Sequence, residues 1–222
     1  MNDRLLKFER DAGTLEERLV AGLAKIALAS RQELFRAGVE SGVSAAQAQV
    51  LVHLARDGPA TVGELAANLA VTAPTVSDSL AALERRKLVA KERDRADARR
   101  VLVRATAQGM KLGESLTLWP EFLVDGVSQL SDEEKSALLR AVLILIGSLV
   151  DRGVVQRARM CVTCSYFRPW HSPGAARPHY CTLADLPLAA DALRVDCPEH
   201  VVAEPDRGRT ARAAFSHRSA TS

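Results

Sequence analysis

The sequence predicts a mainly α-helical protein that carries one small β-hairpin and, near its C-terminus, a short cysteine-rich extension. Three observations support this fold class. Apolar residues recur at helical spacing through most of the chain, a basic and β-branched stretch interrupts them at 89–104, and all four cysteines fall within 161–197. Because 47% of the 222 residues are hydrophobic but only 4% are aromatic, Leu, Val and Ala are expected to form the core.

Long apolar helices are predicted on both sides of the hairpin. A capping box at Thr14 begins the first, which is expected to end near Phe35, and a second box at Ser131 begins the last, which continues to Val150. The apolar run within the last helix is shorter than the roughly 20 residues that span a membrane. Both helices are more apolar than one small domain requires, so we expect a homodimer in which they interlock. The alternative is that each packs only on its own domain.

Two short helices joined by a tight turn are predicted between the long helices. Thr61 can cap the first and Thr72 the second, because a hydroxyl accepts from the free amides of a helix start and Pro74 suits the first helical turn. The apolar side of the second helix turns inward, which leaves its N-terminal end exposed and able to reach DNA base edges. The candidate residues at this end are Thr72, Pro74, Thr75, Ser77, Asp78 and Ser79.

The hairpin after these helices concentrates positive charge. Between Glu84 and Arg104 nine Lys and Arg residues stand against four acidic residues, so this segment carries +5 while the whole chain carries +3. Such a segment is suited to contact DNA phosphates. Its candidate contact residues are Arg85, Arg86, Arg93, Arg95, Asp97, Arg99 and Arg100.

Several short motifs occur here in unbroken order. They are Leu65-Ala66, Pro74-Thr75-Val76-Ser77, Leu83-Glu84, Asp97-Ala98-Arg99, and Val101-Leu102-Val103 followed by Thr106 and Gly109. Over roughly residues 15–150 the chain thereby resembles the MarR family of winged helix-turn-helix transcriptional regulators. The resemblance implies long terminal dimerisation helices, a β wing whose Arg99 enters the minor groove beside a steadying Asp97, and a small aromatic effector. The chain departs from the family at Asp78 and Ala98, where relatives often carry basic residues.

The cysteine-rich extension has the composition of a metal site. All four cysteines and three of the five histidines fall within 161–200. A C-x2-C turn presents two thiolates to one ion, and distant Cys or His residues can complete a tetrahedron. The sequence therefore predicts a zinc site. The expected ligands are Cys161, Cys164, Cys181 and Cys197, with His179, His200 and His171 as alternates.

Other interpretations of these cysteines stay open. Four thiolates with Pro198 after the last also fit an iron–sulfur cluster, although the spacing is not that of ferredoxins. A reversible dithiol at Cys161 and Cys164 would lack the strand–helix alternation of thioredoxin-like domains. Disulfides would conflict with the cytoplasmic location that we expect because the charged opening MNDRLLKFERD lacks a secretory signal pattern.

The predicted domains are a DNA-binding and dimerisation domain at 1–150, a metal-binding extension at 151–203 and a disordered basic tail at 204–222. The sequence contains no Gly-rich phosphate loop and no nucleophile elbow, so we do not expect an enzyme. The predicted function is a dimeric, sequence-specific DNA-binding regulator, a repressor, that acts on a pseudo-palindromic operator. The alternatives are a metal- or redox-sensing regulator and a metal-stabilised protein-interaction module.

Overall fold

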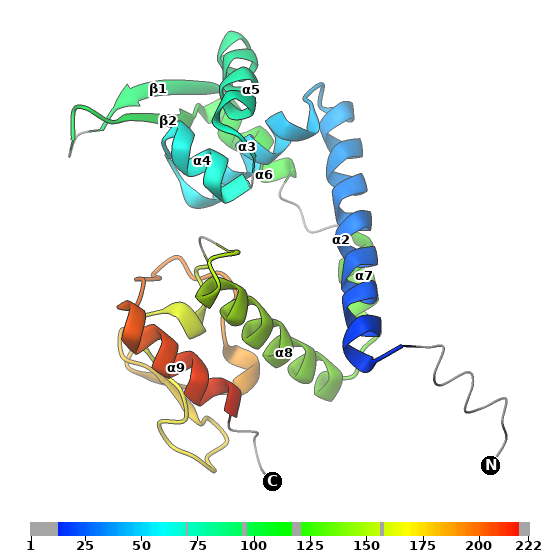
Figure 1. Ribbon diagram of the computed structural model, residues 1–222, viewed down its shortest axis with the longest axis vertical. Helices are drawn as coiled ribbons and strands as arrows, with labels where there is room; N and C mark the ends of the chain where they lie inside the picture. The colour runs from blue at the N-terminus through cyan, green and yellow to red at the C-terminus, as the bar shows by residue number, and fades with distance from the viewer. Residues whose placement is uncertain (1–12, 70, 95–96, 117–120, 156–157, 218–222) are drawn as a thin grey trace, which may run out of the picture. The chain divides into compact units, whose positions relative to one another are not determined.

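The computed structural model describes residues 13–69, 71–94, 97–116, 121–155 and 158–217. The chain forms two compact units, the first ending at Glu121 and the second beginning at Phe122 (Figure 1). This division lies earlier in the chain than the predicted boundary at residue 150, and it places the last apolar helix in the second unit. The charged opening of the chain and Pro120, at which we expect a helix to kink or end, lie outside the described residues.

The first unit contains five helices in its described part. They are α2 (Leu15–Glu40), α3 (Ala45–Asp57), α4 (Val62–Leu69), α5 (Ala73–Arg85) and α6 (Ala107–Leu116). The predicted capping box of α2 is confirmed, since the Glu17 amide donates to Thr14 Oγ1 at 3.1 Å and the Thr14 amide donates to Glu17 Oε2 at 2.8 Å. However, α2 continues past Phe35, because Gly38 fits within the helix against Ala48 and the chain turns only at Gly42, whose φ is +71°.

The predicted hairpin is confirmed as β1 (Val89–Arg93) and β2 (Val101–Ala105), which pair antiparallel. Ala60 extends this sheet, because its amide and carbonyl exchange hydrogen bonds of 3.0 and 2.8 Å with Val103. Buried aliphatic side chains from α3, α4, α5 and both strands form the core. His53 lies in this core, with its Nδ1 3.0 Å from Asp57 Oδ2 and its Nε2 3.4 Å from Asn68 Nδ2.

Helix α6 packs directly on backbone through two glycines. A Cβ on Gly109 would lie 1.8 Å from the Leu88 carbonyl oxygen, and one on Gly113 would lie 2.5 Å from the Leu51 carbonyl oxygen. Such overlap excludes a side chain at either position. These glycines bring α6 against both α3 and the start of β1, so they fix the base of the hairpin.

The second unit combines three helices with a small sheet in its described part. The helices are α7 (Glu121–Ser128), α8 (Asp132–Asp151) and α9 (Pro205–His217), and the 3₁₀-helices are η1 (Cys161–Thr163) and η2 (Ala190–Ala192). Strands β3 (Phe167–Arg168), β4 (His179–Cys181) and β5 (Leu186–Leu188) form an antiparallel sheet in that order. The core contains Leu143, Met160, Val162, Phe167, Leu193 and Phe215. The extension thus covers one side of α8.

The prediction of a disordered tail is wrong for the described part of that segment, because Pro205–His217 form helix α9. Phe215 is only 2% exposed and anchors the helix in the core, and Arg140 of α8 donates to the Phe215 carbonyl oxygen at 3.2 Å. A single aromatic anchor gives no periodic apolar pattern, so the sequence does not reveal this helix. None of the described helices combines the length and the apolar character needed to cross a membrane.

Candidate functional site

The N-terminal end of α5 is exposed, as predicted for a helix that reads DNA. The Thr72 hydroxyl caps it by accepting from the Thr75 amide at 3.4 Å, and the two hydroxyl oxygens lie 2.8 Å apart. Pro74, Ser77 and Asp78 are exposed. Ser79 differs from its prediction, since it is 8% exposed and donates to the Thr75 carbonyl oxygen at 3.0 Å. This hydroxyl is therefore occupied inside the unit.

The side chain of Arg99, at the tip of the hairpin, projects into solvent. The Arg99 side chain is 93% exposed, and its Nε lies 3.2 Å from Asp97 Oδ1. The same carboxylate oxygen accepts from the Arg99 amide at 3.0 Å, which closes a local turn. Asp97 thus orients both the backbone and the side chain of Arg99. Arg95, another predicted contact, lies outside the described residues.

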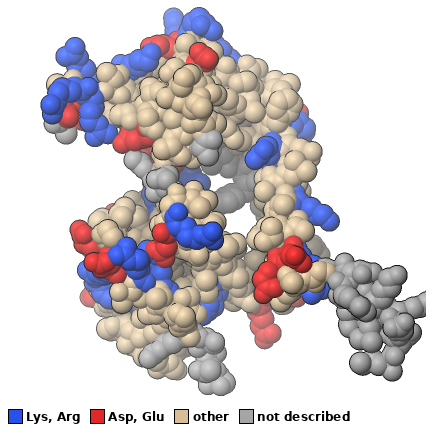
Figure 2. Space-filling model, viewed as in Figure 1, with Lys and Arg blue, Asp and Glu red and all other residues tan. Residues whose placement is uncertain are grey.

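The remaining basic candidates differ in whether they contact other residues of the first unit. Arg86 Nη1 donates to the Gly42 carbonyl oxygen at 2.5 Å, which ties the end of α5 to the end of α2. Arg100 pairs with Glu64 at 2.9 Å and with Asp94 at 3.6 Å. Arg85 and Arg93 are exposed. Figure 2 shows Lys and Arg side chains gathered over the hairpin of this unit. All four arginines are exposed, but Arg86 and Arg100 already make contacts within the unit.

Helix α2 exposes a row of apolar side chains. Leu15 is 60% exposed and Leu19 58% exposed. Leu23 and Ile26 continue the row at helical spacing. A folded chain rarely leaves such a large contiguous apolar surface in water, so this face is suited to protein contact.

All four cysteines of the second unit line one cavity of about 150 Å³. They are half-buried free thiols that come from η1, from β4 and from the loop before His200. Burial raises the pKa of the Cys161 thiol, the Arg194 amide lowers it through a hydrogen bond, and the other three cysteines raise it. Cys161 thus lies close enough to each of the other three cysteines to interact with it electrostatically. The sequence alone does not indicate that Arg194 lies beside these cysteines.

None of the three candidate histidines lines this cavity in the described structure. His179 is 1% exposed among the rings of Phe167, Trp170 and Phe215, and its Nδ1 accepts from the Trp170 amide at 3.1 Å. Burial lowers its pKa to about 4, and the charge of Arg140 adds to this effect. His200 lies 3.0 Å from the Thr163 hydroxyl. His171 lies beside the ring of Tyr180, with the ring centres 4.9 Å apart.

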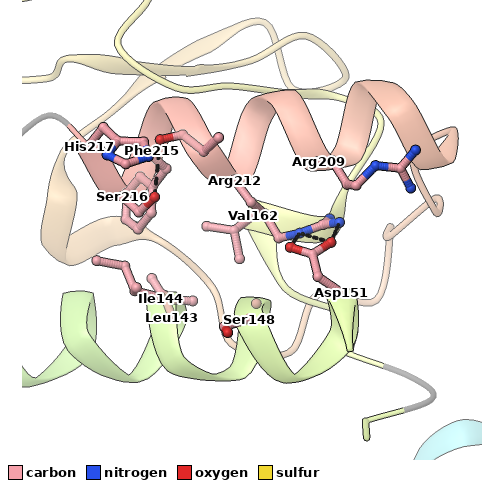
Figure 3. Close-up of a pocket in the computed structure, with 12 residues that line it drawn as sticks. Leu143, Ile144, Ser148, Asp151, Val162, Arg209, Arg212, Phe215, Ser216 and His217 are labelled. Carbon is pink, nitrogen blue, oxygen red and sulfur yellow. Dashed lines mark hydrogen bonds and ion pairs between the residues drawn. The ribbon is translucent and has the colours of Figure 1, made fainter. Parts of the chain in front are cut away.

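No three His, Cys, Asp or Glu side chains in the described part of the chain are arranged to hold a single metal ion. The structure thus brings the four predicted cysteines to one cavity without showing the predicted tetrahedral site. A second cavity, of about 360 Å³, lies between α8 and α9. Figure 3 shows Arg212 and Asp151 paired at one end of this cavity and Phe215 at the other.

Comparisons with known proteins agree with the geometry of the first unit. The model of the MarR family matches residues 41–100. The structure of S. aureus MepR in DNA-binding conformation is 29% identical, with a TM-score of 0.50 over 59% of this chain and 98% of that chain. An S. aureus MepR–DNA complex is 30% identical, with a TM-score of 0.48 over 62% of this chain and 99% of that chain.

A structure of NadR in complex with 4-hydroxyphenylacetate is also similar, at 25% identity and a TM-score of 0.47 over 57% of this chain and 89% of that chain. The comparison with curated proteins gave no match. The matched residues 41–100 include α3, α4, α5, β1 and the tip of the hairpin. Residues 41–100 therefore form a MarR-family domain, and the solved structures that the chain resembles are MarR-type regulators.

Proposed function

We propose that the chain is a sequence-specific DNA-binding regulator that represses transcription by occupying a pseudo-palindromic operator as a homodimer. One observation carries this proposal: the Arg99 side chain projects from the tip of a basic hairpin and is oriented by Asp97 at 3.2 Å. An arginine held in this way can enter a minor groove without first losing the freedom of a mobile loop. We propose no catalytic activity.

The exposed end of α5 supplies the other half of the DNA contact. In helix-turn-helix proteins the N-terminal residues of the second helix reach base edges in the major groove. Thr75, Ser77 and Asp78 occupy this end and are exposed. Asp78 repels phosphate but can accept from the exocyclic amine of cytosine. Arg85 and Arg93 are exposed cations that can contact phosphates and set the position of the helix.

A homodimer is supported by the apolar row on α2, from Leu15 to Ile26. A second copy that covers this row would remove it from water and would bring two hairpins to one DNA duplex. Half-sites would then lie about one helical turn apart, roughly 10 bp. The resemblance to the MarR family also predicts a small aromatic effector, which stays a prediction.

A binding experiment with the full chain tests the proposal. Operator sequences are enriched from random duplex DNA, and the affinity of the wild type for the enriched sequence is compared with that of Arg99→Ala at physiological salt. We expect Arg99→Ala to lose ~1–3 kcal/mol of binding free energy, the value of one specific arginine contact. Arg177→Ala is the matched control, because it removes the same charge from an exposed site in the second unit. Equal affinity of wild type and Arg99→Ala would contradict the proposed role of the hairpin.

A further inference from the structure

The cavity that the four cysteines share is large for one metal ion. Its volume is about 150 Å³, several times the roughly 30 Å³ that one water molecule occupies in the liquid. Apart from the cysteines, mainly apolar side chains line it, among them Phe167, Leu183, Leu186 and Leu188. The charged residues at its wall are Arg194 and Glu199. The cavity therefore offers four sulfur ligands within apolar surroundings.

Four thiols around a cavity of this size suit a cluster better than a single ion. Each Zn–S bond is about 2.3 Å long, so two thiolates on one zinc lie within roughly 4.6 Å of each other. No three His, Cys, Asp or Glu side chains among the described residues are arranged to hold one ion. In a [4Fe–4S] cluster each thiolate binds a different iron atom, so the four sulfurs lie further apart than they do around one ion. We propose that this cavity binds an iron–sulfur cluster through Cys161, Cys164, Cys181 and Cys197.

Backbone hydrogen bonds hold the ligands in place without a cofactor. The Cys161 amide donates to the Arg194 carbonyl oxygen at 3.0 Å, and the Cys197 amide donates to the Arg159 carbonyl oxygen at 2.8 Å. Cys181 lies in the central strand of the sheet, and Cys164 forms a β-bridge with Val202. The four sulfurs thus start from fixed positions, which lowers the entropy cost of binding a preassembled cluster.

Arg194 stabilises the charge that such a cluster would bring. Its amide donates to Cys161 Sγ at 3.2 Å, and its Nη1 donates to Cys197 Sγ at 3.7 Å. On binding, each thiol releases its proton to solvent as its sulfur bonds to iron. The four thiolate charges exceed the positive charge of the cluster core, so the site becomes net negative. Hydrogen bonds to the sulfurs and nearby positive charge tune the reduction potential of a cluster. Arg194 is therefore a positioning and tuning residue of the proposed site.

Analysis of the full chain tests this proposal, which does not depend on DNA binding. The protein is purified without oxygen, reconstituted with ferric iron, sulfide and an excess of thiol that reduces part of the iron, and desalted. We expect four iron atoms per chain, an equal amount of acid-labile sulfide, and a broad visible absorption that dithionite bleaches by supplying an electron. One zinc per chain without sulfide, or no bound metal, would overturn the proposal.

Variants identify the ligands. Cys164→Ser and Cys197→Ser should each lose most of the iron and sulfide, whereas His171→Ala, whose ring lies outside the cavity, should retain both in full. Arg194→Met should keep the iron content, because the backbone hydrogen bond to Cys161 stays, but should shift the reduction potential to a more negative value. An unchanged reduction potential in Arg194→Met would contradict the tuning role of Arg194. Full iron and sulfide in both cysteine variants would overturn the ligand set.

Discussion

Arg212 on α9 pairs with Asp151 at the end of α8, and its Nε lies 3.0 Å from Asp151 Oδ2 (Figure 3). The stem of the arginine lies on Gly147, where an added Cβ would come within 3.0 Å of Arg212 Cδ. The pair is mostly shielded, since the arginine side chain is 13% exposed and the aspartate 32% exposed. This contact fastens the C-terminal helix to the rest of the second unit.

Arg212→Ala should therefore release α9. We expect the free energy of unfolding of the second unit to fall by ~1–3 kcal/mol, the cost of leaving a charged hydrogen-bond partner unmet. Trp170 reports the change, because its indole Nε1 donates to the Ala214 carbonyl oxygen at 3.0 Å. Denaturant titration followed by fluorescence in a Trp119→Phe background isolates this signal. Arg209→Ala, which breaks the exposed pair with Asp206, is the control and should cost under about 1 kcal/mol.

His179 makes the second unit sensitive to acid. Its folded pKa is lowered to about 4 from an ordinary value of 6.5. Between these values the unfolded chain binds a proton that the folded chain does not, so stability is full above pH 6.5 and falls as the pH drops toward 4. The slope reaches at most ~1.4 kcal/mol per pH unit.

Two measurements check this. His179→Phe should make the free energy of unfolding of the second unit depend less steeply on pH between pH 6.5 and pH 5. This holds whether or not the substitution changes stability at pH 7.5. Burial also lowers the pKa of His200, which contributes with the same sign, so an NMR titration of the His179 ring is the decisive measurement. A midpoint near 6.5 for this ring would contradict the prediction.

Two neighbouring arginines at the end of α5 should behave differently. Arg85 is exposed, so Arg85→Ala should reduce the salt dependence of operator binding by about one phosphate contact, ~0.9 in the slope of log K against log salt. Arg86 donates to the Gly42 carbonyl oxygen at 2.5 Å, so Arg86→Ala should lower the stability of the first unit and leave the salt slope unchanged. Affinity measured at four salt concentrations, together with thermal unfolding, separates the two. Equal slopes for Arg85→Ala and wild type would show that Arg85 contacts no phosphate.

The apolar row on α2 predicts the oligomeric state. Leu19→Glu should convert a dimer into monomers of 24.0 kDa, because it places a charge in the surface that a second copy would cover. Lys25→Glu is the control, since helical geometry puts it on another side of α2. Sedimentation at micromolar concentration gives the mass of each variant. A wild-type chain that sediments as a monomer would contradict the dimer. If both variants dissociated, the apolar row would not be the specific contact surface.

Local chemistry allowed the sequence to determine much of the first unit. The capping boxes at Thr14 and, in the second unit, at Ser131 join atoms three residues apart, so they need no tertiary contact and appear as predicted. The hydrogen bond between Asp97 and Arg99, which the family resemblance implies, is likewise local because it joins residues two apart. The hairpin follows from β-branched residues on both sides of a polar tip.

Long-range contacts decided the rest. Arg86 reaches a carbonyl 44 residues away, so its internal role is invisible beside the equally basic Arg85. Helix α9 forms because Phe215 finds a core built from segments far earlier in the chain, and that core also takes α8 into the second unit. The sequence limited the candidate metal ligands to four cysteines and three histidines. Only tertiary structure decided that these thiols share one cavity while the three histidines stay outside it, because burial, hydrogen bonds and ring packing hold the histidines elsewhere.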